Sequence, residues 1–134
     1  MTAPTSLLGL AHRGLTDASR TTAPGERYAL AHLAALRAAA AVLACRTRPV
    51  APARRSRPRP VWVLLAEVAP ELREWAGFFA AGAAKRAAAE AGLAGVVSPR
   101  EADDLLRDAQ SFVAVVETTL STRVASDGRA VMVG

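Results

Sequence analysis

Residues 98–117 read SPREADDLLRDAQSFVAVVE, and this stretch carries the clearest helix signal in the chain. Ser98 suits the capping position, Pro99 suits the first helical position, and Glu101 completes a capping box with the serine. The apolar residues that follow recur at spacings of three and four, which predicts one buried face. These residues are Ala102, Leu105, Leu106, Ala109, Phe112, Val113 and Val116. We expect this helix to end near Thr118.

Three further helical segments precede it: one at about residues 5–19, one that starts after Thr21 or Thr22 and runs to about Arg46, and one at about residues 61–90. Thr21 or Thr22 is expected to cap the second segment, and Pro70 is expected to kink or break the third, because proline lacks an N–H. Four amphipathic helices with one long connection predict an all-α fold, a four-helix up-and-down bundle. We place the bundle at residues 5–118 and expect a frayed tail at residues 119–134.

The second of these segments shows a heptad-like pattern. Ala29, Leu33, Leu36, Ala40 and Leu43 repeat at alternating spacings of four and three, which predicts the buried seam of a bundle. With that seam, Arg27 would point to solvent and His32 would lie at the edge of the seam.

Residues 47–60 read TRPVAPARRSRPRP, with four prolines and no acidic residue. The prolines exclude a helix, so we predict a long, flexible, extended loop. Its five arginines account for the whole net charge of +5, which leaves the rest of the chain neutral. Two interpretations stay open: a solvated linker, or a loop that binds phosphates without sequence preference. The candidate phosphate-binding residues are Arg54, Arg55, Arg57 and Arg59.

Length and cysteine content narrow the class of protein. The 134 residues fit one domain that can bury a core. The single cysteine, Cys45, excludes an internal disulfide, and a reducing, cytoplasmic setting is expected. The N-terminus lacks the pattern of a signal peptide, and charged residues interrupt each apolar stretch, so no membrane span is predicted. We expect no metal ion and no cofactor.

Three ordered phrases resemble a known family. They are ERYALAHLAALRAAAAVLA (26–44), VWVLLAEVAPELREWAGFFAAGAAKRAAAEAG (61–92) and the phrase at 98–117, with the Arg/Pro-rich spacer between the first two. Together they resemble a subfamily of short, stand-alone HEPN-domain proteins from actinobacteria, over about residues 5–118. The resemblance implies a helical bundle of four or five helices, often a homodimer. Many HEPN proteins are metal-independent ribonucleases of toxin–antitoxin systems, whereas others have lost catalysis and bind nucleotides or partners.

The catalytic signature of the superfamily is an arginine followed, after four to six residues, by a histidine. Arg27 and His32 match this spacing. Histidine can act as a base and arginine can stabilise a phosphorane, so the residue types suit RNA cleavage. Against this, the pair lies in the second helix and not near the last one, and 16 arginines make chance matches common. We therefore favour a non-catalytic module that binds RNA, a nucleotide or a protein partner, with a ribonuclease as the alternative.

Two further features remain. His12 and Arg13 would join a polar patch with His32 if the first two helices pair, although ordinary surface residues are the favoured interpretation. Phe78 lies one step off the buried stripe of its helix, beside Gly77, Ala80, Ala81 and Gly82. An exposed apolar face of small residues predicts a contact with a second bundle, which would make the protein a homodimer.

Overall fold

The computed structural model describes residues 3–47 and 59–133, and side chains as far as residue 122. It contains α1 (Pro4–Arg20), α2 (Pro24–Arg46), α3 (Val61–Val68), a 3₁₀ turn η1 (Pro70–Leu72), α4 (Arg73–Glu90) and α5 (Pro99–Val133). The predicted all-α class is confirmed, and the described residues contain no strand. They hold five α-helices where the sequence predicted four, because the chain breaks at Pro70 and the expected third helix becomes α3 and α4.

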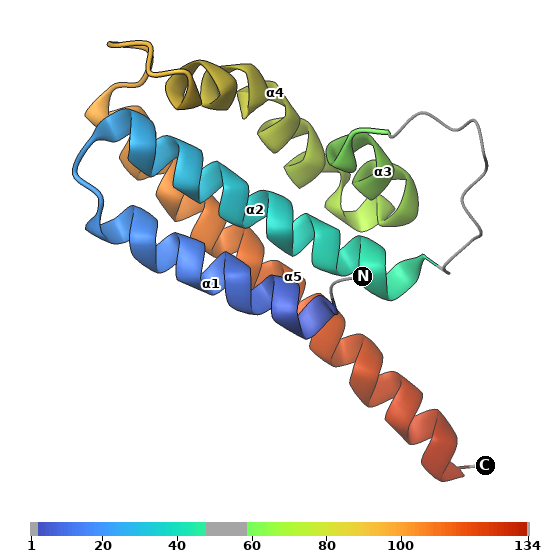
Figure 1. Cartoon of the computed structure of the whole chain (residues 1–134). Helices are drawn as coiled ribbons and strands as arrows, with labels where there is room; N and C mark the ends of the chain where they lie inside the picture. The colour runs from blue at the N-terminus through green and yellow to red at the C-terminus, as the bar shows by residue number, and fades with distance from the viewer. Residues whose placement is uncertain (1–2, 48–58, 134) are drawn as a thin grey trace.

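α2 is the central helix of the fold. It lies antiparallel beside α1, while α5 packs behind this pair and α3 and α4 cover another side of α2 (Figure 1). α1 and α2 approach closely because small residues face each other. A methyl group added at Gly14 would lie 3.3 Å from the Cβ atom of Ala34. The alanine content of the chain therefore allows its helices to pack closely.

The predicted seam on α2 is wrong. Its residues Ala29, Leu33, Leu36, Ala40 and Leu43 are only partly buried. The buried residues of α2 form a different and wider set: Tyr28, Ala31, His32, Ala34, Ala35, Ala38, Ala39, Ala41 and Val42. The physical reason is that α2 contacts α1, α3, α4 and α5, so it must bury more of its circumference than one seam.

α2 is also long and apolar enough to span a membrane by length and composition, with a mean hydropathy of 1.6 over its most apolar window. Half of that window is buried inside the fold. A helix buried at the centre of a bundle has the same composition, and the packing of α2 accounts for it.

An aromatic cluster joins α3, α4 and α5. The ring centroids of Phe79 and Phe112 are 5.2 Å apart, as are those of Trp62 and Phe79, and Trp75 lies 5.5 Å from Phe112. Phe79 and Phe112 are fully buried. Such contacts fill the space that small alanine side chains leave between more distant helices.

The start of α5 confirms the predicted capping box. The backbone N–H of Glu101 donates to the Ser98 hydroxyl over 3.1 Å, and the backbone N–H of Ser98 donates to the Glu101 carboxylate over 3.1 Å. Ahead of α2, by contrast, neither predicted threonine caps the helix: the capping position is Ala23, which makes no side-chain bond. The Thr21 hydroxyl donates instead to the carbonyl of Asp17 at the end of α1.

The end of α5 differs from the prediction. The helix passes Thr118 and continues to Val133. The hydroxyls of Thr118 and Thr119 donate to carbonyls one turn earlier, and Leu120 is buried, so this part of the chain still supports a packed helix. Residues 48–58 lie outside the described part, and the flexibility of loop 47–60 stays a prediction.

Candidate functional site

His32 lies in the core, whereas the sequence predicted a position at the edge of the buried seam of its helix. Its side chain is fully buried, and its Nε2 atom lies 2.7 Å from the carbonyl oxygen of Phe79 on α4. The ring centroids of Trp62 and Phe79 are each 5.9 Å from the imidazole, edge to face. His32 thus connects α2 to α4 within the aromatic cluster.

The surroundings of His32 determine its protonation. A carbonyl only accepts, so Nε2 must carry the proton and Nδ1 must carry the lone pair if the ring is neutral. Nδ1 is buried and has no hydrogen-bond partner. Burial lowers the pKa of His32, and the hydrogen bond to Phe79 offsets this only in part. The nitrogen that would act as a base is therefore closed to solvent and to any large substrate.

Tyr28 lies one turn before His32 on the same face, with its ring stacked 6.4 Å from the imidazole. Both side chains rest on Gly82 of α4. A methyl group added at Gly82 would lie 2.7 Å from the Tyr28 hydroxyl oxygen and 3.4 Å from Cδ2 of His32. Burial raises the pKa of Tyr28, which keeps the phenol protonated at neutral pH. Glycine at position 82 is what allows this side of α2 to approach α4.

Arg27 is engaged in structural contacts. Its Nε donates to the carbonyl oxygens of Ala18 at 3.2 Å and Thr21 at 3.0 Å, at the end of α1. Its Nη1 donates to the Asp103 carboxylate on α5. The prediction that Arg27 points freely to solvent is therefore wrong, since this arginine neutralises the negative end of α1 and ties it to α5.

The structure does not bring the candidate catalytic residues together. Arg27 contacts α1 and α5, whereas His32 contacts α4. His12 is exposed and forms an ion pair of 3.0 Å with Glu117 on α5. It shares no partner with His32, and Arg13 is exposed. The polar patch expected from these residues does not form within the described chain.

One of the four candidate phosphate-binding arginines is described. Arg59 donates to both carboxylate oxygens of Glu67, at 2.8 and 2.5 Å, in an exposed pair. Arg54, Arg55 and Arg57 lie outside the described residues. In the described part of the chain, no three histidine, cysteine, aspartate or glutamate side chains gather where they would hold a metal ion.

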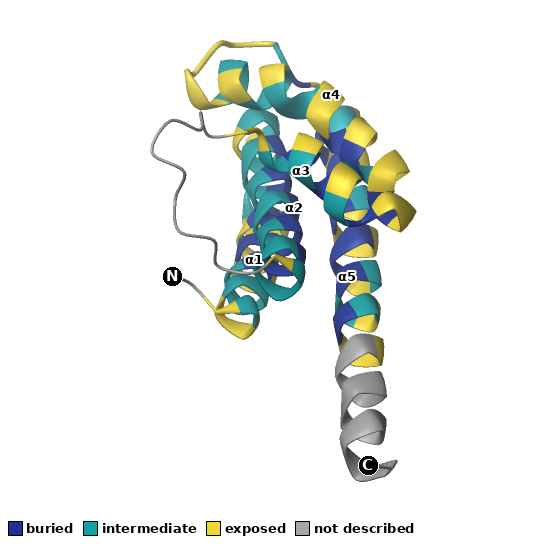
Figure 2. Cartoon of the chain, turned by 90° about the vertical axis from the view of Figure 1, so that its right-hand side faces the viewer, coloured by how far each residue is buried: buried dark blue, intermediate teal, exposed yellow. Residues whose placement is uncertain are grey.

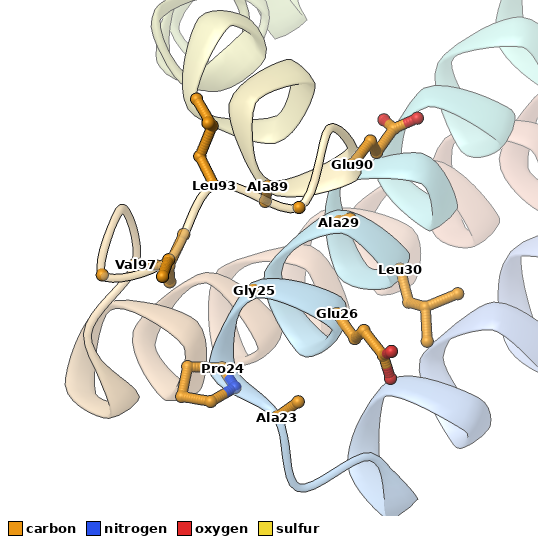
Figure 3. Close-up of a pocket in the computed structure, with 13 residues that line it drawn as sticks. Ala23, Pro24, Gly25, Glu26, Ala29, Leu30, Ala89, Glu90, Leu93 and Val97 are labelled. Atoms are coloured by element: carbon orange, nitrogen blue, oxygen red, sulfur yellow. The ribbon is translucent and has the colours of Figure 1, made fainter.

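A hollow of about 870 Å³ lies away from the motif, between the first turn of α2 and the connection from α4 to α5 (Figure 3). Its lining is mostly apolar, with Leu30, Leu93 and Val97, and it includes the carboxylates of Glu26 and Glu90. Neither Arg27 nor His32 lines it. Two carboxylates and no cation make this hollow a poor receptor for phosphate groups.

Sequence reasoning missed the partners of the predicted residues. Arg27 contacts Asp103, which lies 76 positions along the chain. His32 contacts the Phe79 carbonyl, 47 positions away, and faces Gly82, 50 positions away. No local sequence pattern connects residues this far apart. Tyr28 could have been predicted as a neighbour of His32, because it lies four residues earlier and residues at that spacing share a helix face.

A model of the SAV_6107-like HEPN family matches residues 18–117, about three quarters of the chain. No curated protein and no solved structure matches. The matched region begins near the end of α1 and includes α2, α3, α4 and the part of α5 that packs against them. This chain therefore belongs to the SAV_6107-like HEPN family.

Proposed function

We propose that this HEPN protein is a cytoplasmic, non-catalytic homodimer that binds RNA through the arginines of residues 47–60. The burial of His32 carries the non-catalytic part of the proposal. Its base-capable nitrogen has no access to solvent, and its other nitrogen is held by a backbone carbonyl. An arginine that caps α1 and pairs with Asp103 would have to leave both contacts to reach a phosphate.

The charge distribution supports RNA as the ligand. The chain outside residues 47–60 has equal numbers of acidic and basic residues, and most described cations near α4 and α5 are paired. The excess positive charge of the chain is thus concentrated in residues 47–60, which include Arg54, Arg55 and Arg57. Binding of this kind depends on released counterions, so it is blind to sequence and weakens steeply with salt.

The test measures binding of labelled single-stranded RNA by fluorescence anisotropy at several salt concentrations, in EDTA. We expect replacement of Arg54, Arg55 and Arg57 by serine to weaken binding and to reduce the salt slope by about 2, since each phosphate contact contributes roughly 0.7. The matched control replaces three exposed arginines elsewhere, Arg13, Arg100 and Arg107, by serine, and should retain most of the affinity.

The same samples are analysed on a gel for cleavage. Intact RNA supports a non-catalytic role. Cleavage by the wild type that is lost in a folded His32→Gln variant would overturn it in favour of a metal-independent ribonuclease that uses Arg27 and His32. Equal loss of affinity in both arginine variants would assign RNA binding to total charge, and no binding at all would favour a nucleotide or a protein partner.

A further inference from the structure

The hollow beside the first turn of α2 has the size of a ligand site. Its volume of about 870 Å³ is in the range of sites that take small organic molecules. The start of α2 and the end of α4 meet there, since a methyl group added at Gly25 would lie 3.6 Å from the Cβ atom of Ala89. The connection between α4 and α5 closes another side, and most of its residues are exposed (Figure 2).

This connection is held in a defined shape. Gly92 has a φ of 79°, which favours glycine, and its N–H donates to the Ala89 carbonyl at 3.0 Å. The N–H of Leu93 donates to the Ala88 carbonyl at 3.2 Å, which completes a Schellman motif at the end of α4. The hollow is therefore bounded by two helices and a hydrogen-bonded turn, and a ligand would not have to order its walls.

The charged residues that line the hollow are both acidic. On α2, Glu26 shares one face with Ala29 and Leu30, three and four residues later. Glu90 is the last residue of α4, and both carboxylates lie toward the side on which Leu30 lies (Figure 3). Glu26 forms no ion pair with any residue that the structure describes. The last turn of α4 has no basic residue, so the negative end of that helix adds to the charge of Glu90.

The ion pair of Glu90 with Arg86 leaves this carboxylate able to bind a second cation. Nε of Arg86 lies 3.0 Å from Oε1 of Glu90, yet this nitrogen is buried and makes no hydrogen bond. The two groups are therefore poorly aligned, and pairs one helical turn apart contribute little when they are exposed, as Glu90 is. A carboxylate has two oxygens and accepts several hydrogen bonds, so Glu90 can also accept from a ligand.

We propose that the hollow binds an aliphatic diamine or polyamine. One ammonium group pairs with Glu26, a second pairs with Glu90, and the methylene chain between them lies on Ala29 and Leu30. Charge complementarity selects this class, because two carboxylates beside an apolar surface suit two cations joined by an apolar chain. A purely apolar ligand would take both carboxylates out of water without a partner, which costs free energy. The inference depends neither on RNA binding nor on a dimer.

Isothermal titration calorimetry of the full chain with terminal diamines of increasing length tests the proposal. The series is diaminobutane, diaminohexane, diaminooctane and diaminodecane. We expect one length to bind best, because both ammonium groups must reach a carboxylate at once. The alkylamine with the same number of carbons should bind at least roughly threefold more weakly, which is the share of one exposed ion pair. Added salt should weaken the diamine more than the alkylamine.

Charge-neutral variants test the two carboxylates. Glu26→Gln and Glu90→Gln each retain the size of the side chain and remove its charge, so the diamine should bind to either variant no more tightly than the alkylamine does. Glu74→Gln is the matched control, because Glu74 is an exposed glutamate of α4 outside the hollow. It should retain the wild-type affinity. Circular dichroism checks that all three variants fold.

Three results would overturn the site. They are no binding of any diamine, an affinity for diamines that does not exceed that for alkylamines, and equal weakening by Glu26→Gln and Glu74→Gln. The last of these would assign the binding to total charge. RNA binding by residues 47–60 is measured separately, so each of these results leaves the proposed function to its own test.

Discussion

At the scale of single residues, His32 and Arg27 show how the same residue types serve structure when their surroundings change. A histidine acts as a general base when its lone pair faces a substrate. In this fold the lone pair of His32 faces the core, and the N–H holds α4. Arg27 is close along the chain but turned about the helix toward α1 and α5. The pair stabilises three separate contacts of α2.

Burial of His32 makes stability dependent on pH. Its folded pKa is lowered from the ordinary value of 6.5, chiefly by burial, and nearby Arg86 also disfavours the charged ring while Glu90 favours it. The unfolded chain therefore binds a proton before the folded chain does. The contribution of neutral His32 to the free energy of unfolding is fully present above about pH 6.5. Below that pH it falls by up to about 1.4 kcal/mol per pH unit, until the folded pKa is reached.

Urea denaturation between about pH 7.5 and pH 5.5 measures this loss, above the range where most carboxylates titrate. In His32→Gln the amide can still donate to the Phe79 carbonyl, so we expect a stable fold with a much shallower slope. His12→Gln leaves the buried imidazole in place and should still lose stability as the pH falls below about 6.5. If all three proteins lose the same free energy of unfolding, burial of His32 is not the cause.

At the scale of helices, Gly82 determines how closely α2 and α4 approach. Glycine to alanine within a helix normally stabilises by about 0.5–1 kcal/mol. At Gly82 the new methyl group would lie 2.7 Å from the Tyr28 hydroxyl oxygen, on a buried ring that cannot move freely. We expect Gly82→Ala to reduce the free energy of unfolding by about 1–3 kcal/mol, as overpacking does.

Gly9→Ala is the matched control for this change. Its methyl group would meet only the end of the flexible Arg13 side chain, at 3.6 Å, so this variant should gain the ordinary stabilisation. Tyr28→Phe removes the clashing hydroxyl, and combined with Gly82→Ala it should recover most of the loss in a double-mutant cycle. Chemical denaturation measures the wild type and these four variants, and additive losses would show that the hydroxyl is not responsible.

Helix boundaries were predictable where the signal is local, and helix faces were not. Pro24, Pro70 and the Ser98 capping box indicated where helices begin or break, because each acts within one turn. The face of α2 was predicted wrongly. The spacing of its leucines indicated one buried seam. However, the helix is apolar around nearly its whole circumference and has four neighbouring helices, so its alanines become buried as readily as its leucines. The contacts of Arg27 and His32 join residues that are far apart in the sequence, so they could be identified only from the three-dimensional structure.

At the scale of the whole molecule, the basic segment and the folded body are distinct in composition. The all-α body is neutral, and its described ion pairs between elements join α1 to α5, α2 to α5, α2 to η1 and α4 to α5. Exposed pairs of this kind contribute little stability each, so the burial of apolar side chains must hold the bundle. The aromatic cluster is the part of that core in which α3, α4 and α5 meet around His32 of α2.

Phe112 tests whether these helices unfold as one unit. It is fully buried and contacts Trp62, Trp75 and Phe79 from α5. We expect Phe112→Ala to reduce the free energy of unfolding by about 3–5 kcal/mol, a large share of the total of a domain of this size. The exposed residue Leu93 provides the control, and Leu93→Ala should change stability by less than about 0.5 kcal/mol.

Two probes follow the unfolding of the Phe112→Ala variant. Tryptophan fluorescence reports α3 and α4, which contain both tryptophans, while circular dichroism reports all helices. If the aromatic cluster makes the helices one cooperative unit, both transitions shift together to a lower denaturant concentration and stay coincident. A fluorescence transition that precedes the loss of helix would mean that α3 and α4 unfold alone. In that case local unfolding of α3 and α4 would need less free energy than unfolding of the whole bundle.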